Sequence, residues 1–309
     1  MKYLHLCRTW LLYDEKRRRQ LNQEWNNLTF STLPYPPGGT TAVLDVRKGL
    51  PFGDGVFDAV YANHLIEHLL PVEASALADE FRRVLRPRGV VRVVVPDLER
   101  AARYYLAALE RRLAEHSPAA QRRYEWGVIN LIDQKVRHRT GGLMLDAMRV
   151  ETDKELLREL FGDVATRLFP DIAPDAHRRR GAMARAIEMN PRELAYALLC
   201  RAKWQLARGD TRKLGENDRW GWDRLSLETL LEARGFVGYE VMEFDRSAIP
   251  GWERYDLDSS SLGEYPFEPS VYVESSAALK CCPALTASDR ARRHDSRTTP
   301  MEGRTTRQR

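Results

Sequence analysis

The motif at residues 64–68, HLIEH, places two histidines and a glutamate close together. This H-x-x-E-H spacing is that of a class of metalloproteases in which both histidines bind zinc and the glutamate acts as the base. Residues 56–61, immediately before it, form a short, mostly apolar run that is typical of a strand buried on both faces. Because the motif comes at the end of such a strand, we expect no zinc at His64 and His68. Instead, we expect His64 to face a ligand cleft and His68 to cap and pack the following helix.

A strand, a helix and a second strand surround this motif. After the strand at 56–61, residues 73–85 repeat apolar side chains at steps of three and four, which indicates an amphipathic helix. Residues 90–95, VVRVVV, have the composition of a second buried strand. A crossover of this kind is right-handed and builds a parallel sheet, in which ligands gather beyond the carboxyl ends of the strands. Asn63 and His64 therefore stand where a bound ligand is expected.

Two runs in this unit resemble a known family. They are LPFGDGVFDAVYANHLIEHL at 50–69 and FRRVLRPRGVVRVVVPDLE at 81–99, and they resemble the middle of the class I S-adenosylmethionine-dependent methyltransferases. The resemblance is good over about 42–103, returns at 215–258 and is poor at the amino terminus. Members of this family carry a similar E-H-L segment without a metal, which also favours a site without zinc.

The resemblance implies a fold and a domain organisation. The fold is α/β, with a doubly wound, mostly parallel seven-stranded sheet of the Rossmann-like methyltransferase type. One methyltransferase-like domain at 1–277 then contains a helical insertion at about 98–214, and the basic residues 278–309 lack periodicity and form a disordered tail. The expected interior strands are 42–44, 56–61 and 90–95, and the expected carboxyl-terminal antiparallel hairpin joins 237–244 to 271–275.

The cofactor loop departs from the family pattern. Where the family has Gly-Cys-Gly after its first strand, this chain has Cys7, Arg8 and Thr9. Glycine permits positive φ and a close approach of backbone N–H groups to the cofactor. The loss of both glycines therefore weakens the binding of the cofactor by this loop. Thr29 stands where the family has an acidic residue that accepts hydrogen bonds from the ribose hydroxyls. Asp45 matches the family carboxylate near the adenine amino group.

These residues leave more than one function open. The resemblance implies S-adenosylmethionine as cofactor and transfer of its methyl group to a small-molecule or sugar-type acceptor. The altered loop also fits a degenerate methyltransferase-fold protein that binds a partner or ligand without catalysis, and an unusual gene start within the first 24 residues is a third interpretation. Gly38 and Gly39 follow three prolines within 34–37 and favour a turn over a displaced nucleotide loop. The residues that the resemblance assigns to the cofactor are Leu6, Cys7, Thr29, Asp45, Val46, Asn63 and His64.

Candidate acceptor residues lie in two later segments. A general base helps only if the acceptor is a hydroxyl or an amine, and His64 is the first candidate, with Asp133 the second. Asp133 and Arg137 share one face of a helical region at 124–148, which is either solvated or meets the substrate, because the family uses this insertion as a roof over the active site. GENDRWGWD at 215–223 resembles a family segment that has a histidine in place of Asp218. The candidate substrate-binding residues are Arg137, Trp220 and Trp222.

Charge and apolar content indicate which classes of partner to expect. The net charge is +5, but from Cys281 onward seven arginines against three acidic residues contribute +4, which leaves about +1 for the rest. We therefore expect no nucleic-acid partner. No run approaches the roughly 20 apolar residues of a membrane span, and the sequence shows no secretion signal. The four cysteines lack metal-ligand or disulfide spacing. The expectation is a cytoplasmic protein that acts on a small molecule, with no membrane partner.

Overall fold

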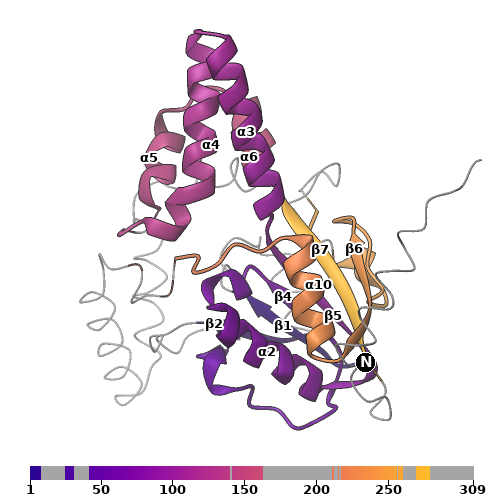
Figure 1. The fold of residues 1–309 in the computed structure, drawn as a ribbon. Helices are drawn as coiled ribbons and strands as arrows, with labels where there is room; N and C mark the ends of the chain where they lie inside the picture. Colours follow the sequence, from indigo (N-terminus) through magenta and orange to yellow (C-terminus); the bar gives the residue numbers. More distant parts are fainter. Residues whose placement is uncertain are drawn as a thin grey trace, which may run out of the picture.

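Seven strands form a single sheet in the order β3-β2-β1-β4-β5-β7-β6 (Figure 1). The computed structural model describes residues 1–7, 25–30, 42–139, 141–162, 211, 215, 217–255, 257–259 and 269–278. The strands are β1 (Tyr3–Cys7), β2 (Trp25–Phe30), β3 (Ala42–Leu44), β4 (Phe57–Asn63), β5 (Leu85–Pro96), β6 (Phe236–Met242) and β7 (Ser270–Ala277). Strands β1 to β5 pair in parallel, whereas β7 is antiparallel to both β5 and β6. The predicted mostly parallel α/β sheet with a terminal antiparallel hairpin is confirmed.

The position of β3 differs from the expectation. Residues 42–44 were expected inside the sheet, but among the described strands β3 pairs only with β2 and forms the edge. The apolar run Ala-Val-Leu indicates a strand, but says nothing about whether both of its hydrogen-bonding edges are paired. Strands β4 and β5 are interior as expected, and they pair in parallel from Ala59 and Val90 to Asn63 and Val94.

Among the described helices, α2 (Pro71–Val84) and α10 (Arg224–Ala233) cover one face of the sheet (Figure 1). Both helices bury apolar side chains at steps of three and four against the inward side chains of the strands. Helix α10 begins after Asp223, whose carboxylate accepts a hydrogen bond from the Ser226 N–H at 2.8 Å. The shared core contains Leu4, Leu6, Leu28, Val91, Val93, Leu77, Phe81, Leu227 and Leu231.

An aromatic and charged layer covers the opposite face. The chain after β6 passes across this face, and its short 3-10 helix η4 (Trp252–Arg254) packs Trp252 against Tyr61 with ring centroids 5.1 Å apart. Below it lies Arg92, which is fully buried in β5. The Arg92 guanidinium binds Asp258 Oδ2 and Glu274 Oε1, at 2.8 Å in each case. A buried arginine therefore joins β5 to β7 and to the crossing chain.

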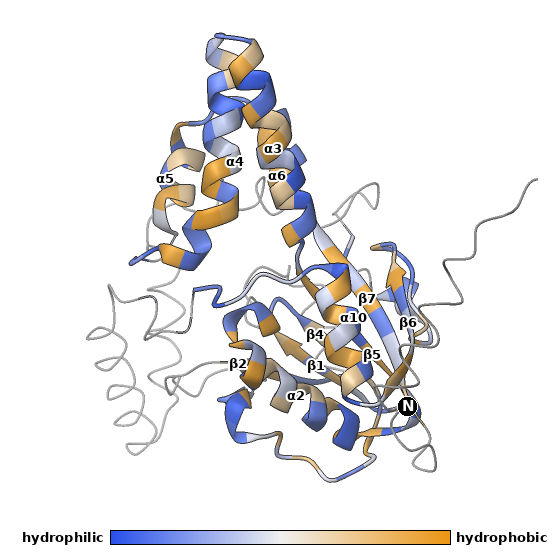
Figure 2. Cartoon of the chain, viewed as in Figure 1, coloured by the Kyte–Doolittle hydropathy of each residue, from blue (hydrophilic) through white to orange (hydrophobic). Residues whose placement is uncertain are grey.

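Within the described part of the chain, four helices follow β5 and project beyond its carboxyl end (Figure 1). They are α3 (Leu98–Ala114), α4 (Pro118–Val136), α5 (Gly142–Val150) and α6 (Lys154–Phe161). Figure 2 shows blue and orange alternating along them, the pattern of amphipathic helices, and their small core contains Trp126, Met148, Leu157 and Phe161. These helices form the described part of the expected insertion, and residues 163–210 lie outside the described residues. Among the described helices, none combines the length and the apolar character of a membrane span.

Asp133 joins two of these helices. The region 124–148 was expected as one helical stretch, but it divides between α4 and α5. Gly141, at the N-cap of α5, has φ +83° and provides no capping side chain. Instead, the buried Asp133 accepts hydrogen bonds from the Leu143 N–H at 2.9 Å and the Met144 N–H at 3.2 Å. Asp133 therefore satisfies two of the N–H groups that a helix start leaves without intrahelical partners.

Removing this cap should cost stability. Asp133→Ala leaves both N–H groups without their acceptors, so we expect the free energy of unfolding to fall by about 1–2 kcal/mol in urea denaturation. Asp133→Asn keeps one acceptor oxygen and should cost less. Asp146→Ala, which removes an exposed carboxylate from α5, is the matched control. An Asp133→Ala protein as stable as that control would show that the cap contributes nothing.

The buried His5 should make the stability of the protein depend on pH. Its ring stacks on Tyr61 at a centroid distance of 5.0 Å, and its Nδ1 lies 3.0 Å from Asn27 Oδ1. Burial lowers the pKa of His5 to about 4, although the hydrogen bond to Asn27 acts in the opposite direction. Between pH 6.5 and 4 the unfolded chain therefore binds a proton that the folded chain does not, and stability falls as the pH falls.

The size of this effect can be measured by comparison. In urea denaturation, the free energy of unfolding of the parent should fall by up to about 3 kcal/mol more than that of His5→Leu between pH 6.5 and pH 4. The variant lacks the group that titrates. The other titratable groups are common to both proteins and cancel in the difference. Equal losses in the two proteins would contradict the buried, neutral state of His5.

Candidate functional site

The carboxyl ends of the central strands lie side by side. Cys7, the last residue of β1, is in register with Thr29 of β2 on one side and with Asn63 of β4 on the other. Asn63 is in turn opposite Val94 of β5. After β1 the chain builds β2 and β3 on one side and then crosses to β4 on the other, so the boundary between β1 and β4 is a topological switch point. Ligands of open α/β sheets bind in the crevice at such a point.

The predicted cofactor residues divide into two groups at this edge. Cys7, Thr29 and Asn63 come together in the register of the strands, as expected. Leu6 and Val46 are buried in the apolar core, so their side chains pack there and only their backbone groups can reach a ligand. Arg8 and Thr9, which replace the end of the glycine loop, lie outside the described residues.

Asp45 follows β3 and caps a short turn. It is the N-cap of the 3-10 helix η2 (Val46–Lys48), and its Oδ1 accepts from the Arg47 N–H at 3.2 Å. The Arg47 side chain binds both Asp45 oxygens, with Nε to Oδ1 and Nη2 to Oδ2 each at 2.8 Å. This side-chain hydrogen bond from Arg47 lowers the pKa of Asp45. The carboxylate is therefore an ionised acceptor, and Arg47 competes for it.

His64 turns the chain at the end of β4. Its φ is +46°, a conformation that non-glycine residues rarely adopt, and its N–H donates to the Val94 carbonyl at 2.9 Å. Its Nδ1 lies 3.4 Å from Glu67 Oε1, and its Nε2 lies 3.2 Å from Ser270 Oγ. A carboxylate at Nδ1 favours the tautomer with the proton on Nδ1, which leaves Nε2 as the basic nitrogen.

Glu67 lies at the centre of a buried group. We call His64, Glu67 and His68 the Glu67 cluster; Glu67 Oε1 faces His64 Nδ1 at 3.4 Å and His68 Nε2 at 3.8 Å. Burial would raise the pKa of Glu67, but the hydrogen bond from His64 and the charges of both histidines hold it below its ordinary value. The other oxygen, Oε2, is buried and has no hydrogen-bond partner within the described part of the chain.

His68 packs against the 217–218 segment, which differs from the expectation. Its Nδ1 lies 3.2 Å from the Asn217 carbonyl and 3.6 Å from Asp218 Oδ1, while the N-cap of α2 is Leu70. Burial raises the pKa of Asp218. Within the described residues, no group of three or more potential ligands is arranged to hold a metal ion. The absence of zinc at His64 and His68 stays a prediction.

The segment 217–222 joins the helical insertion to the sheet. The Asp218 N–H donates to the Gln134 carbonyl at 3.0 Å, which connects the segment to α4. The N–H groups of Arg219 and Trp220 donate to the Glu67 carbonyl at 2.7 and 3.1 Å. The Leu98 N–H donates to the Trp222 carbonyl at 3.0 Å. Three parts of the fold therefore meet around Glu67.

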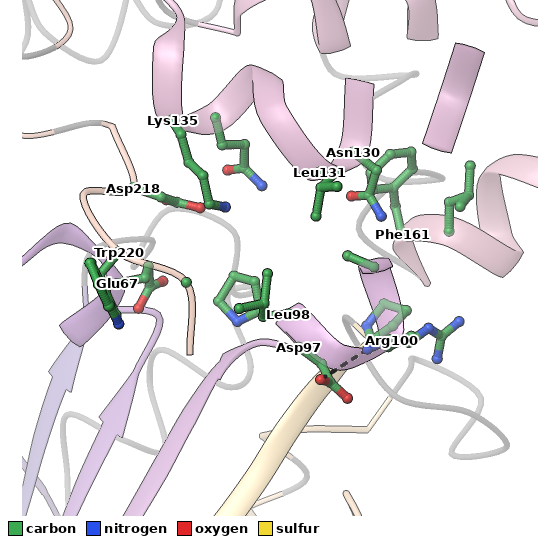
Figure 3. A pocket seen from close by; sticks show the side chains of 16 residues that line it. Glu67, Asp97, Leu98, Arg100, Asn130, Leu131, Lys135, Phe161, Asp218 and Trp220 are labelled. Atoms are coloured by element: carbon green, nitrogen blue, oxygen red, sulfur yellow. Dashed lines mark hydrogen bonds between the residues drawn. The ribbon is translucent and has the colours of Figure 1, made fainter. Parts of the chain in front are cut away.

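A pocket lies between this segment, the end of β5 and the helices above it (Figure 3). Glu67 and Asp218 line one side of it, and Asn130 and Phe161 line the other. Helix α4 provides part of the lining, through Asn130, Leu131 and Lys135. Further lining residues are Asp97, Leu98, Arg100 and Trp220.

Only one of the three predicted substrate-binding residues lines this pocket. Trp220 does, and 46% of its surface is exposed. Trp222 belongs to the apolar core, where its Nε1–H donates to the Ile66 carbonyl at 3.3 Å, so its indole is unavailable to a substrate. Arg137 is the C-cap of α4 and is not among the lining residues, and nor is Asp133, which holds the start of α5.

Two lining residues were present in the sequence motifs without being assigned to a site. Glu67 was considered only as the base of a zinc protease, and Asp218 only as a departure from a family histidine. The signal for Glu67 was its distance of three residues from a strand-end histidine, which allows a short turn to bring the two side chains together. Lys135 gave no signal, because a lysine near a helix end is common.

Comparisons with known proteins agree with this architecture. A family model described as a methyltransferase domain matches residues 16–93, and no curated protein matches the chain. Solved structures match the chain at low identity and low TM-score. A chain of a Haloferax volcanii complex between a methyltransferase activator and a methyltransferase is 9% identical, with coverage of 91% of this chain and 84% of that one and a TM-score of 0.38.

Two further structures are similarly distant. A Methanosarcina mazei SAM-dependent methyltransferase is 11% identical over 90% of this chain and 93% of that one, with a TM-score of 0.35. A Thermotoga maritima SAM-dependent methyltransferase is 10% identical over 89% of this chain and 81% of that one, with a TM-score of 0.34. Likenesses at this level do not identify a substrate. Through residues 16–93, the match confirms the resemblance of this chain to the class I S-adenosylmethionine-dependent methyltransferase family.

Proposed function

We propose that this protein transfers the methyl group of S-adenosylmethionine to a small-molecule or sugar-type acceptor. The observation that carries the proposal is the contact between His64 and Glu67, whose Nδ1 and Oε1 atoms are 3.4 Å apart. His64 follows the strand end at the switch-point crevice, and Glu67 lines the neighbouring pocket. Two sites in direct contact are what a reaction between a bound cofactor and an acceptor requires.

The residues at the strand ends suit the adenine of the cofactor better than they suit its ribose. Asp45, ionised and at the end of β3, suits the adenine amino group, which donates hydrogen bonds. Thr29 provides one hydroxyl at the position where the family carboxylate binds the ribose, and Cys7 replaces a glycine. When bound, the cofactor supplies an activated methyl group, so the protein mainly has to align the acceptor and exclude water.

His64 is the proposed general base for an acceptor that must lose a proton. Glu67 at Nδ1 orients the ring and stabilises the charge that would develop on it, in the way that a carboxylate assists a catalytic histidine. The basic Nε2 lies 3.2 Å from Ser270 Oγ, which shows that a hydroxyl can approach this nitrogen within hydrogen-bond distance. Ser270 directly follows Pro269, which lines the pocket.

Arg47 sets how easily Asp45 can receive the adenine. The Asp45–Arg47 pair lies at the surface, with 16% and 35% of the side chains exposed, and such pairs contribute about 0–1 kcal/mol. The cofactor can therefore displace Arg47 at a small cost. If adenine binds here, removing Arg47 should strengthen binding by up to about fivefold, and Asp45→Ala should weaken it.

Calorimetric titration with S-adenosylmethionine tests this prediction. We expect a lower Kd for Arg47→Ala than for the parent and a higher Kd for Asp45→Ala. Arg86→Ala is the matched control, because it also removes a surface arginine that is paired with an aspartate, Asp58, on a different part of the sheet. An Arg47→Ala protein that binds no better than Arg86→Ala would place the adenine elsewhere.

The second candidate function is binding without catalysis. It is favoured by the observation that Arg47 already neutralises Asp45, in a chain that has also lost the glycine loop and the acidic ribose residue. The same titration separates the two functions. Absence of heat for the parent, together with no gain in Thr29→Asp, would show that the cofactor site has been abandoned and would favour the non-catalytic function.

A further inference from the structure

We infer that Glu67 holds the acceptor, and that the acceptor is a neutral, hydroxyl-rich molecule that donates a hydrogen bond to Glu67 Oε2. This inference rests on the proposed function and names the substrate class for the pocket. It begins from one atom: Glu67 Oε2 is buried, and no hydrogen-bond donor reaches it from the described part of the chain. Glu67 itself is only 3% exposed and lines the pocket.

An unsatisfied carboxylate oxygen is costly in a folded protein. Burial removes its water, and the loss is recovered only if a donor binds it. The other oxygen of Glu67 already faces both imidazoles of the Glu67 cluster, at 3.4 and 3.8 Å. The pocket that Glu67 lines is the place where a ligand O–H or N–H can supply this donor.

The position of Glu67 is fixed from both ends. Its side chain lies between His64 and His68, and its carbonyl accepts the N–H groups of Arg219 and Trp220 at 2.7 and 3.1 Å. A group held in this way loses little conformational freedom when a ligand binds, so the hydrogen bond contributes to affinity with a small entropic cost.

The charges around the pocket favour a neutral acceptor. Asp218 lines the same side as Glu67, so a phosphate or carboxylate placed there would be repelled (Figure 3). Asp97 also lines the pocket, and Lys135 and Arg100 offset most of the negative charge of these three carboxylates. A polyhydroxylated molecule suits this mixture, because each hydroxyl can donate to a carboxylate and accept from an ammonium, a guanidinium or an amide.

Aromatic and apolar surface completes the fit. Trp220 exposes 46% of its surface beside Glu67, and Leu98, Leu131 and Phe161 line the pocket further along. Such a combination of a few placed polar groups with apolar walls is usual for small-molecule sites. The apolar residues can contact the C–H faces of a ring whose hydroxyls bind the polar residues.

Saturation-transfer NMR on the full chain, treated with EDTA, tests the inference without knowledge of the natural acceptor. The probes are the methyl α-glycosides of glucose, mannose and galactose, each compared with its per-O-methylated derivative, which has the same ring and no donor. Glucosamine and glucose 6-phosphate serve as cationic and anionic probes. We expect at least one neutral glycoside to bind the parent, its permethylated derivative to bind at least tenfold more weakly, and the phosphate to bind no better than the glycoside.

Glu67→Gln should weaken binding of that glycoside about tenfold, whereas the matched Glu110→Gln, an exposed residue of α3, should leave it unchanged. The parent comparison needs no variant, so it tests the need for a hydroxyl donor even if Glu67→Gln fails to fold. Equal binding of a permethylated glycoside, preference for glucosamine or for the phosphate, or no binding of any neutral glycoside would overturn the inference.

Calorimetry with S-adenosylmethionine on the same preparation separates this inference from the proposed function. Cofactor binding without discrimination between glycosides would refute the role of Glu67 and leave methyl transfer standing. Discrimination between glycosides without cofactor binding would refute methyl transfer and leave the contact of Glu67 with a hydroxyl-rich ligand.

Discussion

Parallel pairing of β1 with both β2 and β4 is the constraint on which the site depends. It brings Cys7, Thr29 and Asn63 to one edge of the sheet, although they are far apart in the sequence. Because β1 is the first strand built and its neighbours follow on opposite sides, its carboxyl end is the position at which open α/β sheets bind their ligands. Any ligand at that position meets the turn after β4, where His64 and Glu67 lie.

Buried polar groups hold this edge in place from two directions. On the face of the sheet opposite α2 and α10, the Asn63 amide donates to the Tyr61 hydroxyl, which donates to Asp258, and Asp258 pairs with the fully buried Arg92. Beyond the strand ends, the Glu67 backbone carbonyl accepts hydrogen bonds from the N–H groups of Arg219 and Trp220, in the chain that returns from the helical insertion. A buried pair is weak evidence for stability in itself, but breaking one partner leaves an uncompensated charge. These groups therefore fix the geometry of the crevice and the pocket relative to each other.

The sequence predicted which segments form strands and helices better than it predicted which segments lie next to one another. Apolar runs predicted the strands β4 and β5, and apolar residues at steps of three and four predicted helix α2. Each pattern is distinct because a buried strand and an amphipathic helix place their apolar side chains at different spacings. The edge position of β3 was not accessible, since Ala-Val-Leu has the same composition in either place. Trp222 and Trp220 illustrate the same limit within one motif, because one indole fills the core and the other lines the pocket. Arg92 within a valine run was a signal, since a lone charge in a buried strand requires partners, but its partners Asp258 and Glu274 lie more than 160 residues away.

We propose that S-adenosylmethionine or its product binds at the carboxyl ends of β1, β2, β3 and β4. Hydrogen–deuterium exchange of the full chain, with and without S-adenosylhomocysteine, tests it most directly. We expect slower exchange at residues 44–48, after β3, and at residues 62–68, around Asn63 and the Glu67 cluster, with little change in α2 and β6. Unchanged exchange in both segments, or protection confined to β6 and β7, would contradict it.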